Sequence, residues 1–294
     1  MAVEPTPVES LTQTTRRLLA KLDARAKKSL GQHFLIDSGV LRKIVEAAEL
    51  SPQDTVIEVG PGLGVLTAEL TKHAGRIIGV ELDDNLAEML KQTLSWASNL
   101  TIVHEDVLKA TPSALLEKAG VPPECAYKVV ANLPYYITSA VLRHFLEGDA
   151  RPGVMVVMVQ KEVARAITAA PGEMSLLSVA VQFYGEARIV SSVSARSFFP
   201  VPKVDSAILK IRLHLRPLID ADKTDSFFEL VRAGFCANRK QLINSLSQGL
   251  SKPKDEIRAL LDKAAIEPKR RAETLTVAEW VKLWRVFDAE AEPC

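Results

Sequence analysis

The chain has 294 residues, of which 47% are hydrophobic and 25% are charged, a balance typical of a globular protein with a sizeable core. Its net charge of +1 means that any surface for nucleic acid must concentrate its basic residues locally. Three widely separated cysteines argue against a disulfide framework or a zinc site, and neither a secretory signal nor a membrane span is predicted, which favours a cytoplasmic location.

Short apolar strands alternate with amphipathic helices through most of the chain. The first helix is predicted at 11–22, and a second begins at Ser38. Strands then follow at 55–59, 77–81, 100–104, 127–131 and 154–159, and helices at 64–73, 84–95, 111–119, 138–147 and 160–170. This alternation predicts an α/β fold with a mostly parallel, doubly wound sheet that helices cover on both faces.

Two further strands, at 186–193 and 206–213, follow a helix predicted at 175–184. In the second strand apolar residues alternate with Lys210 and Arg212, which predicts a half-exposed antiparallel edge strand. After Pro217 only helices are predicted, at 222–236, 239–248, 253–264 and 276–288. The chain is therefore expected to divide into an N-terminal extension (1–26), an α/β domain (27–216) and a small all-helical domain (217–294).

The first strand of the predicted sheet runs into the glycine-rich sequence Glu58-Val-Gly-Pro-Gly-Leu-Gly64. Glycines at a strand-to-helix turn let the backbone approach a ligand closely. A dinucleotide fingerprint that begins at Gly60 requires glycine at position 65, where this chain has Val65. The pattern Glu-x-Gly-x-Gly-x-Gly is instead typical of S-adenosylmethionine sites, although a tight turn needed only for helix packing is the alternative.

Acidic residues end the next two strands. Glu81 is placed to accept both hydrogen bonds of a ribose diol, and Asp106 to accept one from an adenine amino group. Each has a structural alternative, because Glu81 could cap the next helix and aspartate is common in turns. Asp83 is the better candidate for the helix cap. Since carboxyl ends of parallel strands meet at one edge, the glycines and both acids predict a cofactor crevice there.

The fourth strand ends at the same edge in Ala131-Asn-Leu-Pro-Tyr-Tyr136. Pro134 fixes its own φ and keeps Leu133 out of the helical region, so the Leu133 carbonyl is held rigidly. Asn132, this stiffened turn and Tyr135 can hold a flat ring that bears an amine, with oxygens around the amine and an aromatic face beneath the ring. An ordinary strand-to-helix turn is the alternative interpretation.

Five motifs in order closely resemble those of the ribosomal RNA adenine dimethyltransferases, the KsgA/RsmA family. They are Gly31-Gln-His-Phe-Leu35, Glu58-Val-Gly-Pro-Gly-Leu-Gly64, Glu81-Leu-Asp83, Asn132-Leu-Pro-Tyr135 and Phe199-Pro-Val-Pro-Lys-Val-Asp-Ser206. The resemblance runs from about Lys27 to the last helix. It implies a Rossmann-like class I S-adenosylmethionine-dependent methyltransferase domain, followed by a C-terminal helical domain that contacts RNA.

The resemblance also implies a reaction and its residues. Methyl groups pass from S-adenosylmethionine to N6 of two adjacent adenosines in the 3′-terminal hairpin of 16S-type small-subunit ribosomal RNA, giving N6,N6-dimethyladenosine. The residues expected at the cofactor are Gln32, His33, Leu35, Gly60, Gly62, Gly64, Glu81, Leu82, Asp106, Val107 and Asn132. Those expected at the catalytic adenine site are Asn132, Leu133, Pro134, Tyr135 and Phe198. His33 stands where many relatives carry Asn, a minor departure since either side chain can form a hydrogen bond.

The chemistry expected from these residues needs neither a metal nor a general base. Oxygens of the Asn132 amide and the Leu133 carbonyl accept the N6 hydrogens, which localises the nitrogen lone pair and stabilises positive charge as it develops. Tyr135 and, by the resemblance, Phe198 sandwich the extruded base.

The expected partner is small-subunit ribosomal RNA within an assembling 30S-type subunit, bound by a monomeric protein that has no membrane or metal partner. Basic residues that could contact phosphates are Lys27, Lys28, Lys203, Arg239 and Lys240, although single charges are usually solvated. Two alternatives stay open: the related large-subunit dimethyltransferase that protects against macrolides, and a mainly non-catalytic ribosome-assembly or transcription factor. DNA adenine methyltransferases fit less well, because they typically carry Asp-Pro-Pro-Tyr where this chain has Leu133 in the second position.

Overall fold

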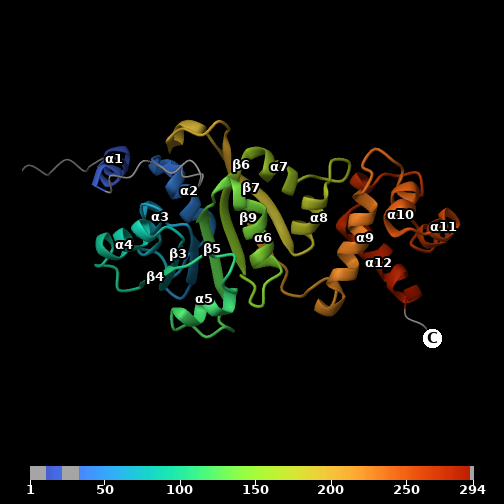
Figure 1. Ribbon diagram of the computed structural model, residues 1–294, viewed down its shortest axis with the longest axis horizontal. Coiled ribbons are helices and arrows are strands. Elements are labelled where there is room, and N and C mark those ends of the chain that lie inside the picture. Colours follow the sequence, from blue (N-terminus) through green and yellow to red (C-terminus); the bar gives the residue numbers. More distant parts are fainter. Residues whose placement is uncertain (1–10, 22–32, 292–294) are drawn as a thin grey trace, which may run out of the picture. The chain divides into compact units, whose positions relative to one another are not determined.

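The computed structural model describes residues 11–21 and 33–291 (Figure 1). In this part of the chain a seven-stranded sheet has the order β4-β3-β2-β5-β6-β9-β7. Its strands are β2 (Thr55–Val59), β3 (Arg76–Glu81), β4 (Leu100–His104), β5 (Tyr127–Asn132), β6 (Val154–Gln160), β7 (Gly185–Val193) and β9 (Ser206–Leu213). A separate antiparallel ladder joins β1 (Phe34–Leu35) to β8 (Phe198–Phe199).

Strands β2 to β6 pair in parallel, and the order of the strands reverses between β2 and β5. In β6 the consecutive residues Met155 to Val159 are all fully buried, so both faces of the sheet are covered. The predicted mostly parallel, doubly wound fold is therefore confirmed. Its topological switch point lies between β2 and β5, where such sheets bind ligands.

The expectation of a half-exposed edge strand at 206–213 is wrong. Strand β9 is antiparallel to β6, as expected, but it lies between β6 and β7, and β7 forms the edge. Lys210 is only 2% exposed, because its ammonium group lies 2.7 Å from a carboxylate oxygen of Glu49. This lysine stem packs against apolar neighbours in the sheet, while its ammonium group pairs with Glu49, whose side chain is 58% exposed.

The chain forms two compact units, and the first holds the sheet. This unit contains residues 1–161 and 188–212, and its described helices are α1 (Leu11–Lys21), α2 (Ser38–Ala48), α3 (Val65–Leu70), α4 (Asp84–Thr93), α5 (Pro112–Lys118) and α6 (Thr138–Leu146). Asp83 caps α4 by accepting from the backbone N–H groups of Asn85 and Leu86, as predicted. Short 3₁₀ turns lie at Tyr135–Ile137 and Ala195–Ser197.

The second unit consists of residues 162–187 and 213–294. Its helices are α7 (Lys161–Ile167, whose first residue belongs to the first unit), α8 (Leu176–Gln182), α9 (Thr224–Phe235), α10 (Leu242–Leu250), α11 (Lys254–Lys263) and α12 (Val277–Ala291), with 3₁₀ turns at Ala221–Lys223 and Ala272–Thr274. The rings of Phe183, Phe227 and Phe228 pack together in its core. Residues 162–187 thus belong to the same compact unit as the C-terminal helices. A single domain boundary at 216 does not describe this division. That the C-terminal helices form an RNA-contacting domain stays a prediction.

One helix of the second unit begins later than its sequence pattern indicated. Helix α10 starts at Leu242, so Arg239 and Lys240 lie in the preceding turn rather than in its first turn. The Lys240 N–H donates to the Ala237 carbonyl, and the Leu242 N–H donates to the Arg270 carbonyl, which ends the turn. None of the helices in residues 11–21 and 33–291 has the length and apolar content of a membrane span.

Candidate active site

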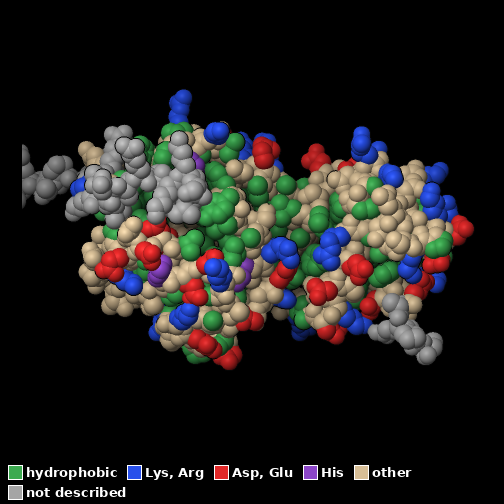
Figure 2. Space-filling view, in the orientation of Figure 1, with side chains coloured by type: hydrophobic (Ala, Val, Ile, Leu, Met, Phe, Trp, Pro, Cys, Tyr) green, Lys and Arg blue, Asp and Glu red, His purple; other side chains and the backbone are tan. Residues whose placement is uncertain are grey.

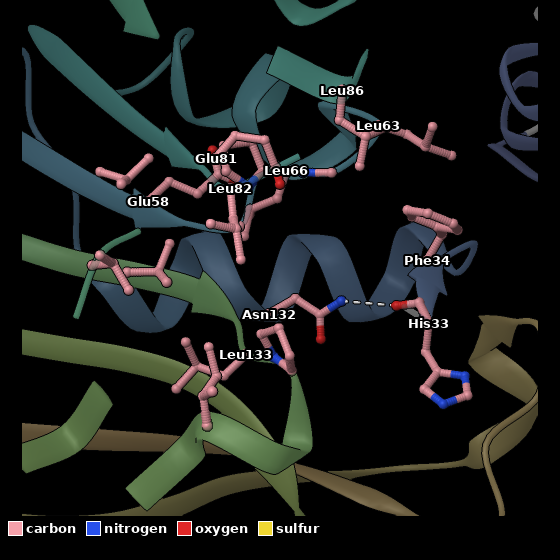
Figure 3. Close-up of a pocket in the computed structure, with 18 of the residues that line it drawn as sticks. His33, Phe34, Glu58, Leu63, Leu66, Glu81, Leu82, Leu86, Asn132 and Leu133 are labelled. Carbon is pink, nitrogen blue, oxygen red and sulfur yellow. Dashed lines mark hydrogen bonds between the residues drawn. The ribbon is translucent and has the colours of Figure 1, made fainter. Parts of the chain in front are cut away.

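A cavity in the first unit lies at the carboxyl ends of β2, β3, β4 and β5 (Figure 3). The parallel register brings these ends to one edge, because Val59 pairs with Val80 and Glu81 pairs with His104. Nine of the eleven residues predicted at the cofactor line this cavity: His33, Leu35, Gly60, Gly62, Glu81, Leu82, Asp106, Val107 and Asn132. Of the other two, Gln32 lies outside the described residues and Gly64 does not line the cavity.

Two glycines of the turn between β2 and α3 have different roles. Gly62 has φ 60°, and a Cβ there would lie 3.3 Å from the ring of Phe34, which is part of the cavity wall. Gly64 has φ 77°, and its Cβ would lie 2.7 Å from Leu90 of α4. Glycine at position 64 therefore permits the turn and the close packing of α3 on α4, whereas glycine at position 62 keeps the cavity open.

Glu81 is held in a fixed position at the end of β3. Its Oε2 accepts a hydrogen bond from the Gly62 N–H at 2.9 Å, and its Oε1 accepts one from the Asp83 N–H at 3.0 Å. Burial raises the pKa of this carboxyl, and the two backbone donors oppose the rise. Each oxygen has a second lone pair, so the carboxylate can still accept both hydroxyl groups of a ribose diol.

Glu58 is a second buried carboxyl in the cavity wall, and it is 1% exposed. Burial raises its pKa to about 8, the hydroxyl of Thr67 opposes the rise, and the charge of Glu81 adds to it. No described residue makes a hydrogen bond to its Oε2. A buried carboxyl oxygen without a partner at the wall of a cavity is suited to a ligand that supplies a polar group to pair with it.

The charged residues of the cavity are all acidic. Among its described lining residues there is no lysine or arginine, and the four carboxyl groups are those of Glu58, Glu81, Glu105 and Asp106. Such a lining disfavours phosphate and favours a cation. S-adenosylmethionine carries a sulfonium and an ammonium group, and its ribose and adenine offer hydroxyl and amino donors to the carboxylates. The residues present therefore fit this cofactor.

The predicted adenine clamp follows β5 and borders the same cavity. The Asn132 amide nitrogen donates to the His33 carbonyl at 3.1 Å, which leaves the amide oxygen on the opposite side as an acceptor (Figure 3). The Leu133 N–H donates to the Met158 carbonyl at 3.2 Å, and Pro134 has φ −58° and ψ 130°. The backbone is thus extended through this turn, as the proline predicts.

Tyr135 is fixed by its hydroxyl group and by its ring face. The hydroxyl lies 2.7 Å from the Ser206 Oγ, and the ring stacks on the His33 imidazole with centroids 5.8 Å apart and planes inclined by 26°. Burial raises the pKa of the phenol, although the bond with Ser206 opposes the rise, so the hydroxyl stays neutral at physiological pH. A neutral, oriented ring is what stacking on a base requires.

Phe198 is not brought to the cavity with the other four predicted catalytic residues. Its side chain is 1% exposed and packs in the core cluster that includes Leu35, Ile44 and Ile208. Its strand neighbour across the β1–β8 ladder is Leu35. Phe198 could stack on a base only after it left this core, so its assignment to the adenine site stays a prediction.

The structure describes three of the five basic residues predicted to contact RNA. Lys203, Arg239 and Lys240 are exposed, and the Lys240 ammonium donates to the Gln248 side chain at 3.0 Å. Lys27 and Lys28 lie outside the described residues. Among the residues that are described, no group of three or more His, Cys, Asp or Glu side chains is arranged to hold a metal.

Sequence reasoning missed the apolar walls of the cavity and the role open to Glu58. The walls are formed by Phe34, Leu63, Val65, Leu66 and Leu86. Phe34 and Leu63 lie within two of the quoted motifs and could have been found by their position, whereas Leu86 of α4 gives no such signal. Glu58 opens the glycine motif, but its burial and its missing donor became visible only in the fold.

Comparison with known families identifies a match over most of the chain. A family model described as ribosomal RNA adenine dimethylase matches residues 23–287. The protein Ribosomal RNA small subunit methyltransferase A from Dehalococcoides mccartyi is 50% identical over 294 residues, covering 100% of this chain and 98% of that protein. The protein of the same name from Enterococcus faecalis is 43% identical over 279 residues, 92% of each chain.

Two solved structures are similar to the chain over nearly the whole of their own lengths. The 23S rRNA methyltransferase ErmE is 33% identical with a TM-score of 0.68, covering 87% of this chain and 99% of that one. A dimethyladenosine transferase from Plasmodium falciparum is 24% identical with a TM-score of 0.75, covering 88% and 98%. The second likeness shows the fold alone, and it agrees with the Rossmann-like sheet described above.

Proposed function

The chain belongs to the ribosomal RNA adenine dimethylase family, and we propose that it dimethylates N6 of two adjacent adenosines in the 3′-terminal hairpin of small-subunit ribosomal RNA. The observation that carries this proposal is the position of the Asn132 clamp on the border of an acidic cavity that fits S-adenosylmethionine. A donor site and a clamp for an amine on one cavity are what direct transfer requires.

The cofactor supplies a methyl group that its sulfonium already activates, so the protein must mainly bind, orient and exclude water. Glu81 and Asp106 hold the ribose and the adenine of the cofactor, and the acidic lining balances its positive charge. Gly60 and Gly62 allow the backbone to lie close to it.

Asn132 and Leu133 prepare the target nitrogen. The N6 lone pair of adenine is delocalised into the ring, which makes it a poor nucleophile. Hydrogen bonds from N6 to the Asn132 amide oxygen and the Leu133 carbonyl favour a pyramidal nitrogen and stabilise the positive charge that develops on it. After the first methylation N6 has one hydrogen left, so the second transfer proceeds with a single one of these bonds. The proton that N6 loses passes to water.

RNA recognition is the part of the proposal that extends beyond the cavity. We place the substrate within an assembling small subunit in the cytoplasm, where the relatives named above carry out methylation of small-subunit ribosomal RNA according to their names. Tyr135 stacks on the extruded base, at roughly 1–3 kcal/mol per stacked base. Basic residues such as Lys203 and Arg239 contact phosphates, and the hairpin is recognised mainly by its shape.

The experiment that tests this function uses labelled S-adenosylmethionine with immature small subunits, with naked small-subunit RNA and with naked large-subunit RNA. We expect N6,N6-dimethyladenosine at two adjacent positions of the small-subunit hairpin. The similarity to ErmE keeps a large-subunit methyltransferase as the second candidate, and preferential labelling of the large-subunit RNA would favour it. Binding to the small subunit without any methylated nucleoside would favour a non-catalytic assembly factor.

A further inference from the structure

His33 makes three contacts that join separate segments of the first unit. Its carbonyl accepts from the Asn132 amide at 3.1 Å, its ring stacks on Tyr135, and its Nδ1 lies 2.8 Å from the Pro200 carbonyl oxygen. A carbonyl oxygen only accepts, so Nδ1 carries the proton that it donates to Pro200. Two of the groups that are expected to hold the target adenine, Asn132 and Tyr135, are thus in contact with one residue.

The β1–β8 ladder explains why His33 reaches these positions. Phe34 pairs with Phe199 and Leu35 pairs with Phe198, so the antiparallel register brings His33 opposite Pro200. The His33 side chain donates to the Pro200 carbonyl and so links the two residues that follow the last backbone pair of the ladder. The ladder therefore fixes the backbone of His33, and with it the carbonyl that Asn132 contacts.

The side chain of His33 points away from the acidic end of the cavity (Figure 3). In Figure 3 its imidazole extends away from the end of the cavity where Glu58 and Glu81 lie, whereas its backbone carbonyl faces Asn132. The ring of Tyr135 is 5.8 Å away, within the range of stacked aromatic pairs, which leaves no space for a base between the two rings. The imidazole thus covers one face of Tyr135, so under the proposed function the base stacks on the other face.

We propose that His33 is the positioning residue of the adenine clamp: its carbonyl orients the Asn132 amide, and its imidazole fixes the ring plane of Tyr135. This inference rests on the proposed function, since it gives a role in base binding to a residue that the family resemblance places at the cofactor. The carbonyl contact forces the Asn132 amide nitrogen toward His33, so the amide oxygen is turned toward the N6 hydrogens. Phe198, buried in the core, does not provide a second aromatic support in this structure.

The test compares His33→Ala, which removes the ring, with His33→Phe, which keeps a flat ring for stacking but cannot donate to Pro200. The control is His73→Ala, which makes the same change at an exposed histidine outside the cavity. Three quantities are measured: quenching of a 2-aminopurine placed at the target position of the hairpin, kcat and KM for the RNA, and the affinity for S-adenosylhomocysteine by calorimetry. Circular dichroism establishes that each variant is folded.

We expect His33→Ala to lower kcat/KM for the RNA roughly tenfold and to weaken the 2-aminopurine quenching, since an aromatic pair contributes about that factor. S-adenosylhomocysteine affinity falls by a smaller factor than kcat/KM for the RNA, because the His33 backbone and the other residues expected at the cofactor remain in place. His33→Phe retains most of the activity and of the quenching. If His33→Ala weakens S-adenosylhomocysteine binding as much as it lowers kcat/KM, or if His33→Phe is as defective as His33→Ala, the proposal is wrong.

A double-mutant cycle tests whether His33 acts through Tyr135. If it does, adding His33→Ala to Tyr135→Ala causes little further loss of 2-aminopurine quenching or of kcat/KM, whereas additive losses would contradict the proposal. The proposed function fails separately: it fails if the unmodified chain forms no dimethyladenosine on the small-subunit hairpin. The quenching and calorimetric measurements do not depend on methyl transfer, so the two failures are distinguishable.

Discussion

Single residues decide which ligand the cavity can accept. Glu58 and Glu81 lie in the same wall with little exposure, and burial raises the pKa of both carboxyl groups. Glu81 has two backbone donors, whereas the Glu58 Oε2 has no donor among the described residues. Burial makes these carboxyl groups costly to ionise in the free protein, and a bound cation offsets that cost. Their burial therefore favours binding of a cation rather than the stability of the free protein.

Glu58 should therefore make the free protein less stable as the pH rises. Its pKa is about 8 in the folded state, whereas the pKa of an exposed glutamate is 4.5. The neutral carboxyl thus contributes fully below pH 4.5, and its contribution is lost as the pH rises through 8. The loss amounts to about 1.4 kcal/mol per pKa unit, or several kcal/mol in all. Glu58→Gln should remove most of this pH dependence, as measured by urea unfolding between pH 5 and pH 9.

The control for this prediction is Glu88→Gln, at an exposed position on α4. It should leave the slope of unfolding free energy against pH unchanged. An unmodified protein whose unfolding free energy does not fall between pH 5 and pH 9 relative to Glu58→Gln would contradict the assigned state of Glu58.

Asn132 should be essential for transfer and dispensable for RNA binding. Asn132→Ala removes the amide oxygen that accepts an N6 hydrogen, and loss of one such oriented group typically lowers kcat by about 100-fold or more. RNA affinity should change little, because phosphate contacts supply most of it. Single-turnover methylation and filter binding measure the two effects, with Asn85→Ala on the surface of α4 as the matched control. A collapse of RNA affinity would show that this division of roles is wrong.

At the scale of elements, helix α1 supports the cavity from outside the family match, which begins at residue 23. Leu19 is 9% exposed and belongs to a core cluster with Phe34, Leu63 and Leu86, which also line the cavity. Leu11, on the same face of the helix, packs against the neighbouring cluster around α2. An element that precedes the residues matched by the family model thus packs on the apolar wall of the predicted cofactor site.

Leu19→Ala should loosen α1 and weaken cofactor binding together. Truncation of a buried leucine typically costs about 2 kcal/mol or more, and here the loss falls on the packing of Phe34 and Leu63. Hydrogen exchange across residues 11–21 should accelerate, and S-adenosylhomocysteine affinity should fall several-fold in calorimetry. Leu215→Ala, which makes the same change at a fully exposed leucine, should change neither quantity. Faster exchange in α1 with unchanged affinity would show that α1 does not support the cofactor wall.

Across the whole molecule, the cavity lies in the first unit, whereas two of the basic residues predicted to contact RNA, Arg239 and Lys240, lie in the second unit. The cavity has an acidic lining, whereas Figure 2 shows Lys and Arg side chains interspersed with acidic ones over the second unit. With a net charge of +1, RNA binding depends on local groups of basic residues rather than on the charge of a whole unit. Arg239 and Lys240 lie in the exposed turn before α10.

Reversing these two charges should weaken RNA binding without affecting the cofactor. We expect Arg239→Glu combined with Lys240→Glu to lower hairpin affinity about tenfold or more and to reduce the salt dependence of binding, by roughly one unit of slope for each phosphate that the protein no longer neutralises. S-adenosylhomocysteine affinity should be unchanged. The control is Lys263→Glu, because Lys263 is already paired with Glu290 at 2.6 Å. If the RNA affinity and its salt dependence are unchanged in the double variant, this turn is not part of the RNA-binding surface.

Most of the sheet could be predicted from the sequence, as could the strand ends that carry the predicted cofactor motif and adenine clamp. Strand periodicity needs only local information, and residues such as Gly60, Glu81 and Asn132 follow strands whose parallel pairing brings their ends to one edge. The position of β9 inside the sheet could not be predicted. A lysine in a strand usually indicates an exposed position, and Lys210 is buried because it pairs with Glu49. That pairing joins residues far apart in the chain, which no local pattern records.

Only the tertiary structure decided the environment of each site residue. It gave Glu58 a buried oxygen without a donor, enclosed Phe198 in the core and brought His33 against both Asn132 and Tyr135. Burial, a missing hydrogen-bond partner and a stacked ring are properties of packing between distant segments. The sequence supplies the side chains and the strand that carries each one, whereas their pKa values and orientations arise from neighbours that the fold selects.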